Sequence, residues 1–201
     1  MVSSAAFSKF SASVAGARVL AGFNGSPSSS SSSQAFTDTC LLSASVAQGV
    51  GCWEGYLEAV LREFVSKTRV QAHRRAWTLI VQFEALVDKM ASDLNTPNWE
   101  KCRDLLLNVT GMDVYPSWIW APKFTNQTDT KAYFDGILKV RHSFAHGFPI
   151  PNDVPGLAVP GTLDPAYVAD AIACLEFFAQ TTDTLLEHEL THRHGCTSGW
   201  S

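Results

Sequence analysis

Apolar residues recur at steps of three and four along most of this chain, and this period restricts the fold more than any other feature. The spacing puts one apolar stripe on each helix, whereas a half-buried strand would alternate apolar and polar residues. Four stripes are clearest: Phe7, Phe10, Val14, Ala17 and Ala21; Val46, Val50, Trp53, Leu57, Val60 and Phe64; Trp77, Ile80, Phe83, Val87, Met90 and Leu94; and Tyr133, Ile137, Val140 and Phe144. The sequence therefore predicts an all-α protein.

End signals mark further helix boundaries. Thr96 and Pro97 are typical of an N-cap and a first helical position, and Gly111 is typical of the stop of that short helix. Gly147 ends a helix predicted over 129–145. A last helix starts near Pro165, with the stripe Val168, Ile172, Leu175, Phe178 and Leu185. We expect a helical bundle of about five to six helices.

The first 37 residues contain no acidic residue and are rich in Ser and Ala. Their composition is also that of an organelle transit peptide, but the helical period favours an N-terminal arm. We expect an N-terminal helix over 1–25, a Ser-rich flexible linker over 26–37, a bundle over 38–195 and a tail over 196–201.

Composition excludes several classes of protein. Of the 201 residues, 46% are hydrophobic and six are Trp, which is enough apolar surface for a core. No run reaches the roughly 18 apolar residues of a membrane span. The net charge of −4 means that RNA contact needs a local patch. Five scattered Cys without C-x-x-C spacing argue against a disulfide framework and fit a reducing cytoplasm.

The segment 141–147, RHSFAHG, concentrates one arginine and two histidines at a helix end. Arginine has a planar fork that fits phosphate oxygens, and histidine can transfer protons near neutral pH. On a regular helix His142 and His146 are about 40° apart, whereas Arg141 and His146 are about 140° apart. Joint action therefore requires either unwinding near Gly147 or a second copy of the helix. An ordinary basic helix end, which complements the helix dipole, would have the same residue types.

Four features in this order resemble the HEPN superfamily, and within it the branch called RiboL-PSP-HEPN. Arg141, His142 and His146 match the family pattern of Arg, a polar residue and a later His. The other features are Trp-Glu-Gly-Tyr at 53–56, Gly-Met-Asp-Val at 111–114 followed by Trp-Ile-Trp at 118–120, and the Ala-His-Gly ending at 145–147. The resemblance runs from about Phe7 to Leu186.

The resemblance implies a metal-independent endoribonuclease without a cofactor, acting on RNA as a homodimer in toxin or phage-defence systems, with a neutralising antitoxin or a sensor protein as partner. His146 is the candidate acid or base, Arg141 the electrostatic clamp, and His142 either a second proton-transfer group or a phosphate contact. The products would be a 2′,3′-cyclic phosphate and a 5′-hydroxyl. Glu54 either orients Arg141 from the neighbouring helix or is a surface glutamate. The alternative is a non-catalytic HEPN module that binds RNA or a protein.

A second motif, HELTH at 188–192, satisfies the zinc-peptidase pattern H-E-x-x-H. Such enzymes need a third ligand, and after His192 the nine remaining residues offer only His194 nearby. We expect a solvated helix end there. His142 and His146 share the same spacing, but the adjacent Arg141 would repel a metal cation, so we expect no metal site in this chain.

Positive charge gathers between the second and third predicted helices, at Lys67, Arg69, His73, Arg74 and Arg75. This segment is either a solvated turn or a contact for the RNA backbone or for a partner. As an RNA contact it would bind through Arg69, Arg74 and Arg75. For Trp77, Trp99, Trp118 and Trp120 we expect core packing rather than base stacking.

Overall fold

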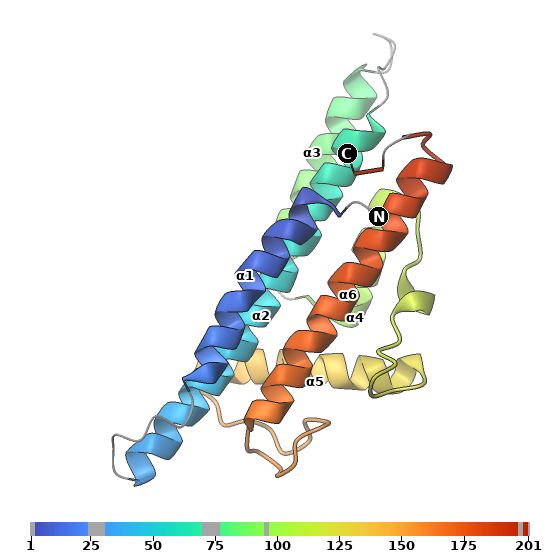
Figure 1. Cartoon of the computed structure of the whole chain (residues 1–201). Helices are drawn as coiled ribbons and strands as arrows, with labels where there is room; N and C mark the ends of the chain where they lie inside the picture. The colour runs from blue at the N-terminus through green and yellow to red at the C-terminus, as the bar shows by residue number, and fades with distance from the viewer. Residues whose placement is uncertain (1–2, 24–30, 70–76, 95–96, 197–198, 201) are drawn as a thin grey trace. The chain divides into compact units, whose positions relative to one another are not determined.

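The structure is a computed structural model that describes residues 3–23, 31–69, 77–94, 97–196 and 199–200, with the backbone alone at 31–33 and 77–78 (Figure 1). Within these residues the protein is an all-α bundle, which confirms the predicted fold class. The six helices are α1 (Ala5–Gly22), α2 (Ser31–Thr68), α3 (Trp77–Ser92), α4 (Trp99–Thr110), α5 (Gln127–His146) and α6 (Pro165–His192), and a short 3-10 turn, η2, covers Tyr115–Ser117. No helix in the described ranges is both long and apolar enough to cross a bilayer.

The described residues form two compact units. One contains the residues up to Phe10, then Glu54–Trp118 and the chain from Phe178 onward. The other contains Ser11–Trp53 and Ile119–Phe177. Helices α1, α2 and α6 therefore each contribute residues to both units.

The N-terminal helix is not a separate arm, as the boundary between 1–25 and 38–195 implied. Phe10, Val14 and Ala17 of α1 are buried. The Ser45 hydroxyl of α2 donates a hydrogen bond of 2.5 Å to the Ala17 carbonyl. Since α1 supplies core residues to both units, the predicted division between arm and body is wrong.

The predicted Ser-rich linker over 26–37 is also wrong in its second part, because α2 begins at Ser31. Residues 26–30 lie outside the described ranges. Once a helix has nucleated, each added residue gains one backbone hydrogen bond, and Ser is only moderately unfavourable in a helix. The strongly apolar helix from Leu42 onward therefore extends back through the serines.

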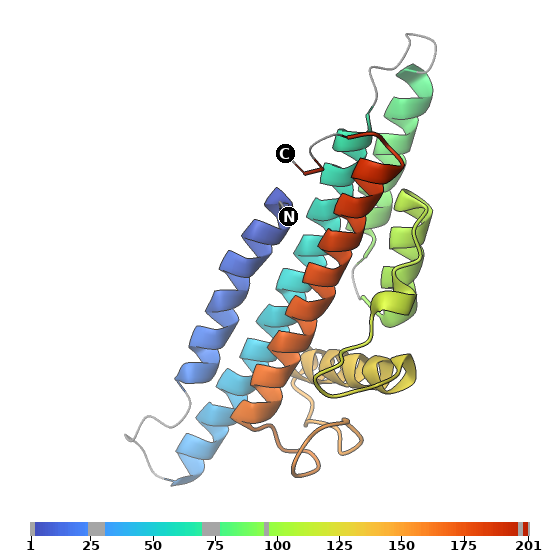
Figure 2. The ribbon, with the colours of Figure 1, turned by 45° about the vertical axis from the view of Figure 1, so that its right-hand side comes forward.

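Aromatic side chains from α4, from the connector after it and from α6 pack in the core of the first unit. In the same unit α3 and α4 lie beside each other (Figure 2). The Trp99 and Trp118 rings meet edge to face at 5.2 Å, and Phe178 lies 5.3 Å from Trp118. The Trp118 indole N–H donates to the Thr182 hydroxyl at 3.1 Å. In the second unit Trp120 is buried too. Core packing is thereby confirmed for these three tryptophans, while the Trp77 side chain lies outside the described set.

Some predicted helix details are wrong. The N-cap of α4 is Asn98, whose side chain accepts a hydrogen bond of 2.7 Å from the Lys101 N–H, and not Thr96, which lies outside the described residues. Phe83 and Phe144, assigned to apolar stripes, are 41% and 43% exposed. In α5 the buried stripe steps by three from Val140 to Ser143, which leaves Phe144 outside; Leu185 of α6 is half-buried, with Leu186 taking the core position.

The start of α1 is held by carboxylates far away in the sequence. The buried Asp183 carboxylate of α6 accepts hydrogen bonds from the Ser4 backbone N–H, at 3.1 Å, and from the Ser4 hydroxyl. Glu63 of α2 accepts from the backbone N–H groups of Ala5 and Ala6 at 3.1 and 3.0 Å. These acceptors satisfy N–H groups that have no partner within the helix, and negative charge there also complements the helix dipole.

Replacing Asp183 by Asn should change how stability depends on pH. Burial raises the pKa of Asp183, the hydrogen bonds from Ser4 oppose this, and the nearby charges of Glu63 and Glu187 reinforce it. The stability that this group contributes is therefore complete below its unfolded pKa of about 3.9 and is lost as pH rises through the folded pKa. Asn does not ionise, so the wild type should lose stability relative to Asp183→Asn across that window. Urea denaturation at a series of pH values measures the difference.

Asp153 provides the control of opposite sign. The hydrogen bond from Lys139 lowers the pKa of Asp153, so its contribution is present above the unfolded pKa and is lost as pH falls through the folded pKa. Asp153→Asn should therefore become less stable relative to wild type as pH rises. A pH trend of the same sign for both variants would contradict this account of Asp183.

Candidate functional site

The candidate site lies at the C-terminal end of α5, in the second unit. The helix begins at an Asn126 N-cap, whose side chain accepts a hydrogen bond of 2.9 Å from the Asp129 N–H. Tyr133, Ile137 and Val140 are fully buried and fix one face of the helix. The polar residues of the RHSFAHG segment are therefore placed by a helix whose position the core determines.

The helix ends at His146, where Gly147 takes the left-handed conformation with φ 67°. The Gly147 N–H bonds to the Phe144 carbonyl at 3.3 Å, and the Phe148 N–H bonds to the Ser143 carbonyl at 2.8 Å. These two bonds form a Schellman motif, and a left-handed C′ position favours glycine because other residues pay a steric cost there. Arg141 and His146 both lie within the α-helix, so the last turn before Gly147 is wound.

The structure places the three predicted site residues as the helical spacing requires. His142 and His146 are exposed, and their ring centroids lie 4.4 Å apart. Arg141 is half-buried, nearer the edge of the core face. The two imidazoles therefore share one surface, while the Arg141 position is about 140° around the helix from His146.

This arrangement has the groups that proton transfer to and from a phosphodiester requires. Two exposed imidazoles side by side can act as one acid and one base, and a guanidinium can stabilise charge on phosphate oxygens. Among the described residues no group of three or more His, Cys, Asp and Glu side chains is placed to hold a metal ion.

Glu54, the predicted orienting residue for Arg141, is half-buried on α2, and its Oε1 atom is buried. Glu54 is thus more buried than the surface glutamate that was the alternative to a role in orienting Arg141. Its neighbours Trp53 and Tyr56 are buried, and the Tyr56 hydroxyl donates to the Ala179 carbonyl at 2.9 Å. The pairing of Glu54 with Arg141 stays a prediction.

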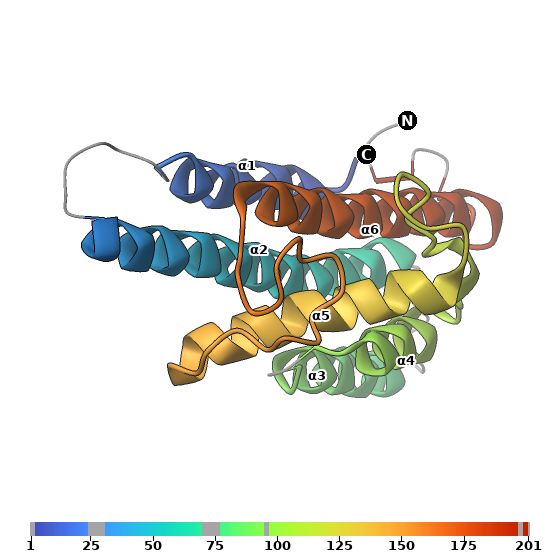
Figure 3. The same ribbon diagram turned by 90° about the horizontal axis from the view of Figure 1, so that it is seen from below.

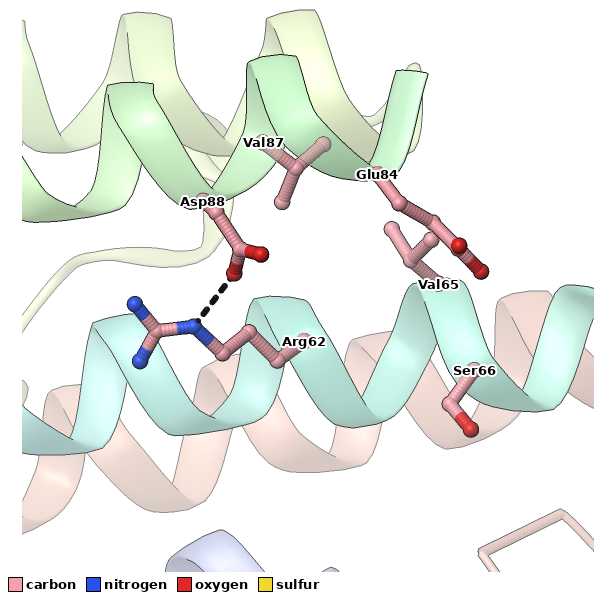
Figure 4. A pocket seen from close by; sticks show the side chains of 6 residues that line it. All are labelled: Arg62, Val65, Ser66, Glu84, Val87 and Asp88. Atoms are coloured by element: carbon pink, nitrogen blue, oxygen red, sulfur yellow. Dashed lines mark hydrogen bonds and ion pairs between the residues drawn. The ribbon is translucent and has the colours of Figure 1, made fainter. Parts of the chain in front are cut away.

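The predicted RNA-binding strip is only partly within the described residues, since His73, Arg74 and Arg75 lie outside them. Arg69 is exposed and pairs with Glu84 of α3 at 3.5 Å. A pocket of about 260 Å³ nearby is lined by Arg62, Val65, Ser66, Glu84, Val87 and Asp88 (Figure 4). Arg62 pairs with Asp88 at 2.7 Å across this pocket. The carboxylates offset the arginine charges there, so the pocket does not favour a polyanion.

The HELTH segment lies at the end of α6. His188 and His192 are exposed, and their rings stack at a centroid distance of 3.8 Å. Glu189 is buried and forms an ion pair with Arg193, with a distance of 3.3 Å between the Oε1 and Nη1 atoms. His194 packs edge to face on Phe64 rather than beside the pair. This geometry is typical of a solvated helix end.

Comparison with known proteins gives no relative: no family model matches the sequence, and no curated protein or solved structure matches it significantly. The HEPN resemblance therefore stays a prediction that rests on the motifs themselves.

Phe148 lies beside this pair, although no sequence pattern singled it out. Its exposed ring lies 5.8 Å from His146 and 6.2 Å from His142. The available signal was an aromatic residue directly after a glycine expected to end the helix, because a residue there is turned back toward the last helical turn.

Proposed function

We propose that this protein is a metal-independent endoribonuclease whose site consists of Arg141, His142 and His146. The observation that carries the proposal is the pair of exposed imidazoles, with ring centroids 4.4 Å apart, one of them directly following the half-buried Arg141. The pair lies at the end of a helix with well-defined caps. The order of the HEPN-like motifs supports the same activity.

In the proposed reaction one histidine removes the proton of a ribose 2′-hydroxyl. The 2′-oxygen then attacks the adjacent phosphorus, and the bond from phosphorus to the 5′-oxygen breaks. The second histidine gives its proton to the leaving 5′-oxygen, while Arg141 stabilises the negative charge on the pentavalent phosphate. The products are a 2′,3′-cyclic phosphate and a 5′-hydroxyl, without any ion or cofactor. We assign proton transfer to His146 and either the second transfer or a phosphate contact to His142.

We further propose that the active unit is a homodimer. Arg141 and His146 lie within one wound helix and about 140° apart, so a single copy presents them poorly to one phosphate. In a two-fold pair each surface patch meets its own copy, and the shared site contains the Arg141, His142 and His146 side chains of both copies. The surface we assign to this contact is the polar side of α5 that bears His142 and His146.

The biological setting rests on the resemblance to the HEPN superfamily. On that ground we propose a toxin or phage-defence effector that acts in the cytoplasm. Control by a neutralising antitoxin or a sensor protein belongs to the same proposal.

Cleavage of RNA should persist in excess EDTA. The histidines and Arg141 supply proton transfer and charge stabilisation, so removal of divalent ions should leave the rate unchanged within about twofold. The measurement is incubation of the protein with total RNA, followed by analysis of the 5′ and 3′ ends of the cleavage products. New 5′ ends should accept phosphate from polynucleotide kinase without prior dephosphorylation, and the new 3′ ends should be cyclic phosphates.

The His146→Ala protein, purified in the same way, controls for contaminating nucleases. Loss of cleavage on chelation, with recovery in magnesium or zinc, would show a metal enzyme instead. RNA that is bound but not cut would favour the non-catalytic HEPN module.

A further inference from the structure

Phe148 is a large apolar side chain exposed beside two histidines. Phe148 is 59% exposed, and its ring lies nearly parallel to that of His146, with an interplanar angle of 25°. The His142 ring is 6.2 Å away at 47°. The three rings form a continuous aromatic surface at the end of α5.

Phe148 has no evident role in ending the helix. In a Schellman motif an apolar residue at the C″ position commonly packs on an apolar residue one turn earlier. Phe148 occupies C″ here, but the helical positions one turn earlier are Ser143, which is buried, and His142. The stop itself is made by the backbone of Gly147, so the aromatic ring is not needed for it.

The backbone on both sides of Phe148 is held in place. Before it stands the Schellman motif, and after it the loop turns back along α5 (Figure 3). Lys139 of α5 bonds to Asp153 of the loop at 2.5 Å, and Val154 is buried. A Cβ at Gly136 would approach Pro155 to 2.9 Å, so the loop lies directly on the helix. Phe148 is thus presented at a defined place, although its ring faces solvent.

We propose that Phe148 is a nucleobase-stacking residue for the RNA cut at the histidine pair. The inference rests on the proposed ribonuclease function and adds to it the group that positions a base next to the scissile phosphate. Every nucleobase has a flat face that stacks on an exposed aromatic ring. A base on Phe148 would bring the phosphate of its own nucleotide close to the adjacent imidazoles. Recognition of this kind tolerates all four bases, so the contact determines position rather than sequence.

The test uses Phe148→Ala, Phe148→Trp and, as a matched control, Phe144→Ala, which removes the other exposed phenylalanine of this segment. Phe148→Ala should weaken binding of a short RNA about 5- to 150-fold, the range for loss of one stacked base. Phe148→Trp should restore binding, and Phe144→Ala should leave it within about twofold. Thermal unfolding followed by circular dichroism checks that all variants fold.

A 2-aminopurine base in the RNA gives a direct signature. Its fluorescence should be quenched at one position by the wild type and by Phe148→Trp but not by Phe148→Ala. With an abasic nucleotide at that position, wild type and Phe148→Ala should bind equally. Unchanged binding and quenching in Phe148→Ala would overturn the stacking proposal.

The same measurements separate this inference from the function on which it rests. If the wild type cuts RNA but Phe148→Ala keeps kcat, KM and quenching, the ribonuclease proposal stands and stacking is wrong. If Phe148 quenches the 2-aminopurine fluorescence but the RNA is never cut, the stacking proposal stands and the ribonuclease proposal is wrong. If Phe148→Ala instead alters only the oligomeric state in sedimentation, the ring is a protein contact and stacking is overturned.

Discussion

Replacing His146 by Ala should lower the rate of RNA cleavage at least about 10²-fold, because a missing proton-transfer group costs that much or more. Arg141→Ala should cost a comparable factor, because the charge of the pentavalent phosphate would lose its stabilising cation. Single-turnover rates with an end-labelled RNA measure both effects. Circular dichroism should show unchanged helix content, since His146 is exposed and Arg141 half-buried.

The chain contains its own matched control for this experiment. His188 and His192 form a second exposed pair at the same spacing on α6, with ring centroids 3.8 Å apart. The double change His188→Ala/His192→Ala should leave the cleavage rate unchanged. If that double variant folds but is inactive, while His146→Ala is active, the catalytic pair lies on α6.

Activity per protomer should fall on dilution, in step with dissociation of the dimer. The reason is the angle of about 140° between Arg141 and His146, which we expect a second copy of α5 to compensate. At protomer concentrations about twentyfold below the dissociation constant less than about a tenth of the protomers are dimeric, so the specific activity should drop more than about tenfold. Mass photometry over the same concentrations gives the fraction of dimer.

Mixing two inactive variants tests whether the site is shared. Arg141→Ala and His146→Ala homodimers each lack one essential group, but a mixed dimer has a site with Arg141 from one copy and His146 from the other. Activity should therefore return on mixing. Full specific activity in a pure monomer, together with no recovery on mixing, would show that one copy of α5 is sufficient.

Much of the fold could be predicted because helical period and end signals are local. Gly111 and Gly147 end their helices as expected, both with left-handed backbone. The errors arise where contacts between distant residues decide. The apolar stripe of α1 indicates a face to be buried, but the local pattern has no signal for its partner, which the bond from Ser45 to Ala17 shows to be α2.

The sequence predicts that His142 and His146 lie on one side of the helix, but it does not predict the aromatic surface beside them. The spacing of His142 and His146 places both rings on one side of α5, and the structure has them there. The position of Phe148 could not be derived from a helical period, since the residue lies beyond the helix. Its place depends on the backbone turn at Gly147 and on the anchoring of the loop through Lys139 and Asp153.

The bond between Ser4 and Asp183 has a consequence for how this protein is made. The two residues are 179 positions apart, so after α1 has left the ribosome the whole stretch up to α6 must still be synthesised before Asp183 emerges. During that time the first N–H groups of α1 lack this acceptor, and contacts over such long separations form slowly. In nascent chains on the ribosome the start of α1 should therefore lack its hydrogen bonds to Asp183. Native protection from proteases at Ser4 should come only after Asp183 has been translated.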